Sequence, residues 1–246
     1  FDGKINTWDF NLGYNFMFRE QPDYRVNPIT KSLGVNEPYA VAWRDTYRFW
    51  SVMDENSFNG NINKDFGKIK IGGGYLKRVR GFNARIFRYT SLDMLDEITN
   101  NTDRYAANFD LGSVYSMYEN EFGKWKLNTG IRSEYNLFNV NTADFSGQKV
   151  DVNRTYLDIL PSLNLSYNLN KTKYRLSASK TLARSEFREI ANFAYYDFIR
   201  NAQLLGNPNL EKSNIYNVDL KWEFYPKAGE NISVSLFGKN FIKPIE

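Results

Sequence analysis

The sequence predicts an all-β protein whose strands form an antiparallel β-barrel that crosses a membrane. Apolar and polar residues alternate over stretches of about ten residues or more, and this alternation gives a strand one apolar and one polar face. The connections between these stretches are alternately short and long. That layout is typical of an outer-membrane barrel, in which the short turns lie on the periplasmic side.

The alternation is clearest near the start of the chain. Large apolar residues occupy the even positions from Trp8 to Phe18, and the odd positions between them are mostly polar. Strands this long suit a tilted membrane crossing better than a soluble sheet, whose strands average about 5–6 residues. We expect nine strands, at residues 7–18, 47–65, 68–89, 105–119, 124–138, 156–169, 173–183, 213–225 and 231–241.

The expected turns fall into two classes. Short connections are predicted at 66–67, 120–123, 170–172 and 226–230, and long ones at 19–46, 90–104, 139–155 and 184–212. Aromatic rings suit the level of the lipid headgroups, and they gather near the short turns as Tyr118, Phe122, Trp125, Tyr167, Tyr174, Trp222, Phe224 and Tyr225. From the phase of the alternation we expect these side chains to face lipid: Leu163, Leu165, Val218, Leu220, Val234 and Leu236.

Composition excludes several classes of function. The chain has no cysteine and no histidine, so it cannot hold a disulfide, a thiolate nucleophile, a Cys/His zinc site or a histidine-based triad. Its 32 basic and 28 acidic residues are well mixed, without the basic stripe that tracks nucleic acid. We expect no metal site, no cofactor and no nucleic-acid partner.

Two other interpretations of the sequence are less favoured. A soluble β-sandwich would also alternate, with its charged face in solvent, but its strands are shorter and its turns lack this asymmetry. The run Gly72-Gly73-Gly74 lacks the Gly-Lys-Ser/Thr ending of a phosphate-binding loop. Glycines in a strand instead permit sharp curvature or close packing.

The last third of the chain carries a family resemblance. The segments YRLSASKTLARSEFREI, LLGNPNLEKSNIYNVDLKWEFYP and ISVSLFGKNFIKPIE closely resemble the later barrel of TonB-dependent receptors, and residues 129–135 resemble another strand of that family. Ser185 stands where the family usually has proline. The matching residues are Thr181, Arg184, Gly206, Asn207, Pro208, Leu210, Asp219, Glu223, Phe237, Lys239, Pro244 and Ile245.

The resemblance implies a receptor that imports a scarce nutrient through a plugged barrel. It implies binding and gated passage without enzyme activity or a catalytic residue. Residues 1–246 would be about nine strands of one larger barrel of about 22 strands, with a signal peptide, a plug domain and the remaining strands outside them. The expected partners are outer-membrane lipid, the chain's own plug domain, the TonB complex of the inner membrane, and a surface lipoprotein or other outer-membrane proteins. The substrate class stays open among metal-siderophores, cobalamins, glycans and peptides. The alternatives are a receptor-like barrel that acts as a scaffold in an outer-membrane assembly, or a passive porin or adhesin.

Two groups of residues are candidates for function. Arg132, Glu134, Asp219 and Glu223 are predicted to face the lumen, where pairing with the plug or with neighbouring strands is favoured over substrate contact. The long connection 184–212 carries aromatic residues and an arginine, which suit ligand capture at the mouth of a barrel, although an aromatic girdle or loop packing explains them equally well. The candidate ligand-binding residues are Phe193, Tyr195, Tyr196 and Arg200.

Overall fold

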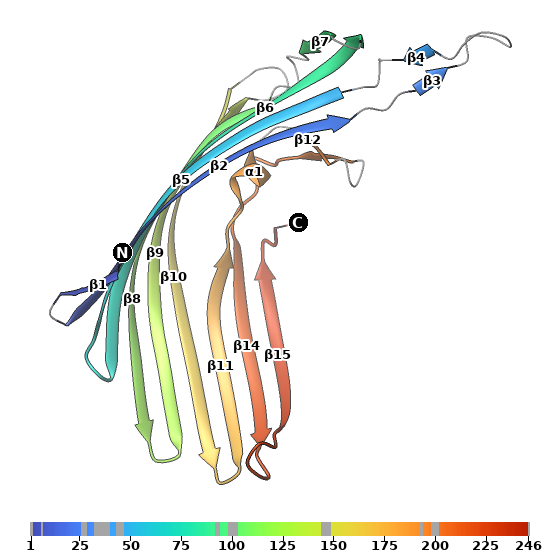
Figure 1. Ribbon diagram of the computed structural model, residues 1–246. Coiled ribbons are helices and arrows are strands. Elements are labelled where there is room, and N and C mark those ends of the chain that lie inside the picture. Colours follow the sequence, from blue (N-terminus) through green and yellow to red (C-terminus); the bar gives the residue numbers. More distant parts are fainter. Residues whose placement is uncertain are drawn as a thin grey trace.

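Ten strands pair in one continuous antiparallel sheet that is strongly curved (Figure 1). The computed structural model describes residues 2–5, 7–25, 29–31, 40–42, 47–91, 94–97, 103–143, 149–191, 194–197 and 202–245. Each of these ten strands pairs with the sheet strands that come before and after it in the sequence, because hairpin connections join them. Along the sheet the strands are β1 (Asp2–Ile5), β2 (Trp8–Arg25), β5 (Tyr47–Asp65), β6 (Ile69–Ser91), β8 (Asp103–Phe122), β9 (Trp125–Ala143), β10 (Lys149–Leu169), β11 (Thr172–Ala183), β14 (Ser213–Phe224) and β15 (Ile232–Ile242).

All nine predicted strands are present, so the predicted fold class is confirmed. Several of them are longer than predicted, and the chain also forms β1 at its start. Five shorter strands occupy the described parts of the long connections: β3 (Ile29–Lys31) pairs with β4 (Ala40–Ala42), β7 (Met94–Glu97) pairs with β6, and β12 (Ala194–Asp197) pairs with β13 (Ala202–Leu205).

The prediction of a long connection at 139–155 was wrong. β9 and β10 continue to pair through Ala143 and Lys149, so residues 144–148 alone join them. The residues in this extension still alternate, with Val140 and Val152 on one face and asparagines such as Asn139 on the other. A strand with polar groups on its outward face is stable in water, so the hairpin extends beyond the apolar band.

The short turns lie at one end of the sheet and the long connections at the other (Figure 1). The turns are tight because they contain residues with positive φ, such as Gly123 (62°) and Asn170 (51°), which two-residue hairpins require. A backbone hydrogen bond also ties each of three turns to the next strand: the amides of Glu119, Asn168 and Tyr225 donate to the carbonyls of Lys68, Lys124 and Lys171, each at 2.8 Å. The turns therefore form a fixed rim.

The register places the apolar and polar residues on opposite faces, which we call the lipid face and the lumen face. Next to the short turns, one row of paired positions on the lipid face forms an aromatic row: Trp125, Tyr167, Tyr174 and Trp222, ending at Val234. The next paired positions form a leucine row: Leu127, Leu165, Leu176, Leu220 and Leu236. Ring centroids in the aromatic row are 4.6 Å apart for Trp125–Tyr167 and 6.5 Å apart for Tyr167–Tyr174.

The six residues predicted to face lipid all share this face in the observed register, and none belongs to the buried core. The predicted gathering of aromatics near the short turns is also confirmed, because four of them form the aromatic row. Within the described part of the chain, no helix is long and apolar enough to cross a membrane.

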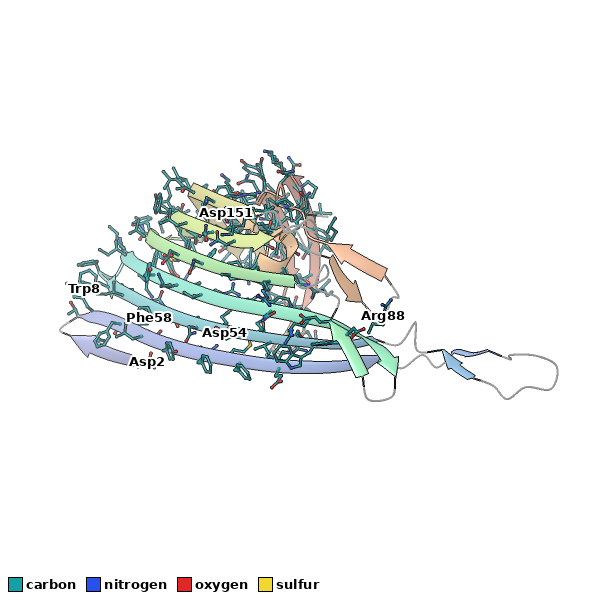
Figure 2. The ribbon with its side chains drawn as sticks, turned by 90° about the horizontal axis from the view of Figure 1, so that it is seen from above. Asp2, Trp8, Asp54, Phe58, Arg88 and Asp151 are labelled. Carbon is teal, nitrogen blue, oxygen red and sulfur yellow. The ribbon has the colours of Figure 1, made fainter. Side chains whose placement is uncertain are left out.

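The buried core lies on the lumen face, at the long-connection end, and was not predicted. It forms where the short helix α1 (Phe187–Ile190) lies against the concave side of the sheet (Figure 1). Seen from above, the sheet curves around this side (Figure 2). The core consists of Tyr105, Ala107, Phe109, Phe138, Val140 and Val152 from the sheet, with Phe187, Ile190 and Ala191 from the loop.

The division into two faces predicts how substitutions at neighbouring positions differ. Leu220→Arg introduces a charge in the middle of the apolar stretch of β14, where it costs roughly 2–4 kcal/mol. Asp219→Asn changes an exposed lumen residue and should cost little. Stability is measured by urea-induced unfolding of the barrel in lipid vesicles.

Asp219→Arg is the matched control, because it introduces the same side chain one residue away on the lumen face. It should be tolerated much better than Leu220→Arg. If Asp219→Arg destabilised the barrel more than Leu220→Arg, the two faces would be inverted.

Candidate functional site

The lumen face carries a cluster of ion pairs near the long-connection end. Glu134 is only 6% exposed and forms ion pairs with two arginines. Arg132 Nε lies 2.6 Å from Glu134 Oε1, and Arg184 Nη2 lies 2.5 Å from Glu134 Oε2. A buried carboxylate needs such partners, because an unpaired buried charge is strongly unfavourable. The predicted residues Arg132 and Glu134 are thus in direct contact.

A second buried carboxylate joins the same cluster. Asp158 is 3% exposed, accepts a hydrogen bond from Lys212 and lies 3.7 Å from Arg184. Arg184 therefore bridges Glu134 and Asp158, which lie opposite each other on β9 and β10. Sequence analysis missed Asp158 and Lys212, although the period-2 phase of β10 already placed Asp158 on the polar face.

A third buried carboxylate, Glu55 on β5, lies in a similar setting. Arg78 approaches it to 3.2 Å and Arg80 to 2.5 Å. Arg78 also lies 3.6 Å from Glu186, at the start of the long loop. Sequence analysis missed this trio too, because polar residues in the phase of the lumen face are numerous and only the register shows which of them meet.

Nearer the short turns, Glu223 is buried between Arg175, at 2.8 Å, and Lys221, at 2.9 Å. Arg175 belongs to the neighbouring strand β11, whereas Lys221 belongs to β14 itself. Asp219 lies on the same face but is exposed, and among the described residues it has no ion-pair partner. Of the four predicted lumen residues, Asp219 is thus the one whose charge is left to water or to a further binding partner.

The first turn of the long loop lies on the lumen face. Phe187 of α1 is 1% exposed and packs on Phe138 of β9, with ring centroids 5.5 Å apart. The guanidinium carbons of Arg78 and Arg80 lie 5.2 Å and 5.1 Å from the centre of the Phe187 ring, within the range of cation–π attraction. The ring of Phe187 therefore fixes the start of the loop against the lumen face of the sheet.

The end of the loop, at Gly206 and Asn207, packs against its beginning, at Glu189 and Ala191. A Cβ atom at Gly206 would lie 1.9 Å from the carbonyl oxygen of Ala191, so only glycine fits there. The amide of Asn207 donates to the carbonyl of Glu189 at 2.7 Å. The guanidinium of Arg154, on β10, donates to the carbonyls of Pro208 and Leu210. We call residues 184–191 and 206–212 the loop base.

These contacts give the Gly206-Asn207-Pro208 motif a physical explanation. The glycine permits the close crossing, the Asn207 side chain accepts from the amide of Asn209 at 2.9 Å, and the carbonyl of Pro208 binds Arg154. The motif fastens the end of the loop to the barrel wall.

The loop base is also joined to the end of β15. Lys243 Nζ lies 2.5 Å from Glu211 Oε2, and this hydrogen bond holds the pKa of the Glu211 carboxyl below its ordinary value. The hydroxyl of Ser213 donates to the carbonyl of Ile242 at 3.3 Å. The exit of the loop therefore has contacts with β10, through Arg154, and with the end of β15.

The predicted ligand-binding residues lie between the two halves of the loop base. Tyr195 and Tyr196 are on β12, opposite Leu204 and Gln203 of β13, and their side chains lie outside the described atoms. Phe193 and Arg200 lie outside the described residues. Their role in ligand binding stays a prediction.

A hollow of about 490 Å³ lies beside the ion-pair cluster on the lumen face. Arg132, Glu134 and Arg184 line its charged side, and Ser162 and Ser179 contribute hydroxyls. Most of its remaining lining is apolar and includes Tyr115, Met117 and Leu160, so the hollow suits a partner with both apolar and polar groups. Among the described residues, no group of three or more acidic side chains could hold a metal ion.

Comparison with solved structures shows the same fold in larger proteins. The ferric citrate transporter FecA matches with a TM-score of 0.62 at 15% identity, and the match covers 98% of this chain and 33% of that one. The ferric yersiniabactin uptake receptor FyuA from Yersinia pestis matches with a TM-score of 0.58 at 10% identity, covering 98% and 34%. The copper transporter OprC matches with a TM-score of 0.53 at 12% identity, covering 89% and 34%.

The chain thus spans about a third of the length of these structures. Curated protein sequences include no match. The sequence model of the outer membrane protein beta-barrel family matches residues 1–243, and the resemblance to the barrel of TonB-dependent receptors is confirmed at the level of fold. The chain belongs to the outer membrane protein beta-barrel family, and it lies in the outer membrane.

Proposed function

We propose that this chain is part of the barrel of a TonB-dependent receptor that binds a scarce nutrient outside the cell and imports it. The observation that carries the proposal is the loop base. A loop of about 29 residues begins and ends in contact with the lumen face. The loop base therefore holds both ends of the segment that contains the hairpin β12–β13. Loops of this length in a compact fold are usually functional or disordered.

The side of the membrane follows from the turns. In outer-membrane barrels the short turns are periplasmic and the longer loops extracellular. The loop base then lies at the extracellular mouth, where a nutrient would first meet the protein. Aromatic and arginine side chains on this loop, including Tyr195 and Arg200, would supply stacking and charged contacts to a ligand.

The lumen face supports a plugged barrel. Most of the buried charged side chains on this face form ion pairs with other residues of the sheet or the loop base. Few unpaired charges are therefore left to attract ions, as they would in an open pore. Asp219, the hollow beside Arg184 and the exposed Phe237 leave surface for a plug domain elsewhere in the protein. Such a plug would be opened by the TonB complex of the inner membrane.

The names of the similar proteins support an uptake role but leave the nutrient open. They name ferric citrate, ferric yersiniabactin and copper as the cargo of those proteins. For this chain the proposed cargo remains a metal-siderophore, a glycan, a peptide or a similar scarce nutrient. The competing roles are a scaffold in an outer-membrane assembly and a passive porin or adhesin.

Growth tests separate these roles. Cells with the full-length protein would be compared with cells lacking it, on single sources of iron, glycan or peptide, with the TonB complex present or depleted. A receptor gives growth on one source that needs both the protein and TonB. Growth that needs the protein but not TonB would indicate a porin, and no growth difference on any source would contradict import.

We predict that the loop 184–212 is extracellular. A cysteine introduced at Asn201 is the only one in this chain, which has none of its own, and it should react with an impermeant thiol reagent on intact cells. A cysteine at Lys171, in a short turn, should react only after the outer membrane is permeabilised. The reverse pattern would place the loop in the periplasm and remove the ligand-binding proposal.

We predict that Arg154→Ala releases the loop without unfolding the barrel. Charge-assisted hydrogen bonds contribute about 1.5–3 kcal/mol each, so losing two should raise the rate of loop cleavage by proteinase K on intact cells about tenfold or more. Arg154→Lys should restore little, because lysine lacks the planar fork that reaches two carbonyls.

Arg104→Ala, on β8, which is separated from β10 by β9, is the matched control and should leave cleavage unchanged. Barrel integrity is checked by the heat-dependent shift in gel mobility, which should persist in all variants. Equal cleavage of Arg154→Ala and wild type would show that Arg154 does not hold the loop.

A further inference from the structure

The lipid face carries a groove that the proposed import function does not use. It has a volume of about 500 Å³ and runs across the aromatic row and the leucine row, from β9 to β15. Its walls are the rings of Trp125, Tyr167, Tyr174 and Trp222, and its inner part is formed by members of the leucine row. A groove on the convex side of a barrel, open to hydrocarbon, suits an acyl chain.

The short turns below this groove carry a row of lysines. Lys124 follows β8, Lys171 follows β10 and Lys227 follows β14, and all three are exposed. The carbonyls of Lys124 and Lys171 each accept a hydrogen bond of 2.8 Å from the next strand, so the backbone of these two lysines is fixed. Lys171 Nζ donates to the carbonyl of Pro226 at 2.7 Å, which leaves two of its three protons for another acceptor.

The groove and the lysines are arranged like the parts of one phospholipid. Lys171 precedes Leu176 by five residues, or about 17 Å along an extended strand. That is close to half of the roughly 30 Å hydrocarbon core. Starting from the turn, a bound molecule would meet cations first, then amphipathic rings, then leucines. This is the order of phosphate, glycerol region and acyl chain.

We propose that this surface binds one glycerophospholipid of the periplasmic leaflet, with its phosphate at Lys171, between the turns that carry Lys124 and Lys227, and an acyl chain in the groove. Lipopolysaccharide is excluded as the occupant by the side of the membrane, because it lies in the outer leaflet. A second copy of the chain would bury the aromatic row but would leave the turn lysines without an anionic partner.

Native mass spectrometry of the full-length protein tests the proposal. The protein would be delipidated in mild detergent and titrated with palmitoyl-oleoyl phosphatidylglycerol. We expect one binding step that is clearly tighter than those that follow. The triple variant K124Q/K171Q/K227Q should weaken this step at least tenfold, since a lysine near an anionic headgroup contributes a factor of about five.

Lys68→Gln is the control for the loss of one charge, because Lys68 lies in the short turn next to that of Lys124 but does not line the groove, and its carbonyl also accepts a hydrogen bond from the next strand. It should leave the tight step unchanged. Leu176→Trp, which fills the groove, should weaken the step, whereas Leu12→Trp on the lipid face of β2 should not.

Four results would overturn the proposal. They are a titration with no step tighter than the rest, an equal loss in Lys68→Gln, lipopolysaccharide retained in place of phospholipid, and a dimer that disappears in Leu176→Trp. Import is not measured in this experiment, so its outcome is independent of the proposed receptor function.

Discussion

Backbone hydrogen bonding in hydrocarbon is the constraint on which the rest of this structure depends. A lipid layer offers no water to an N–H or C=O group, so each must pair within the protein. Ten strands in continuous register meet that requirement along the sheet. Because all the neighbours are in register, the period-2 alternation of each strand adds up to one lipid face and one lumen face.

The two faces differ in the interactions that their side chains make. On the lipid face, the aromatic row lies against the short turns and the leucine row lies deeper, so the sheet has a defined depth in the membrane. On the lumen face, Glu134, Asp158 and Glu223 are buried but each has cationic partners. This pairing lets the wall hold many charges without a large net field. The loop base uses the same network, since Arg184 belongs both to the loop and to the Glu134–Asp158 cluster.

The strands could be predicted because period 2 is a local property of the sequence. The phase of Leu163, Leu220 and Leu236 was readable for the same reason, and so was the lumen position of Arg132 and Glu223. Partners across strands were not readable. The strand register places Asp158 opposite Glu134, where Arg184 bridges the two carboxylates. The end of the long loop brings the carbonyls of Pro208 and Leu210 to Arg154. The apolar patch around Phe138 lies on the otherwise polar face and is buried by Phe187 of α1, a contact that the sequence does not reveal. Gly206 could be recognised as part of a motif, but its reason is a contact with Ala191, which only the folded loop creates.

The most direct test of the two-faced barrel is a spin-label scan of β14 and β15 in the full-length protein, reconstituted in lipid vesicles. A label would be placed at each position from 216 to 224 and from 232 to 240, and its collision rates with oxygen and with a water-soluble nickel chelate would be measured. We expect oxygen accessibility to peak at the even positions of both strands, with the odd positions shielded from oxygen. Peaks at the odd positions, or no period of two, would contradict the assignment of the lipid and lumen faces.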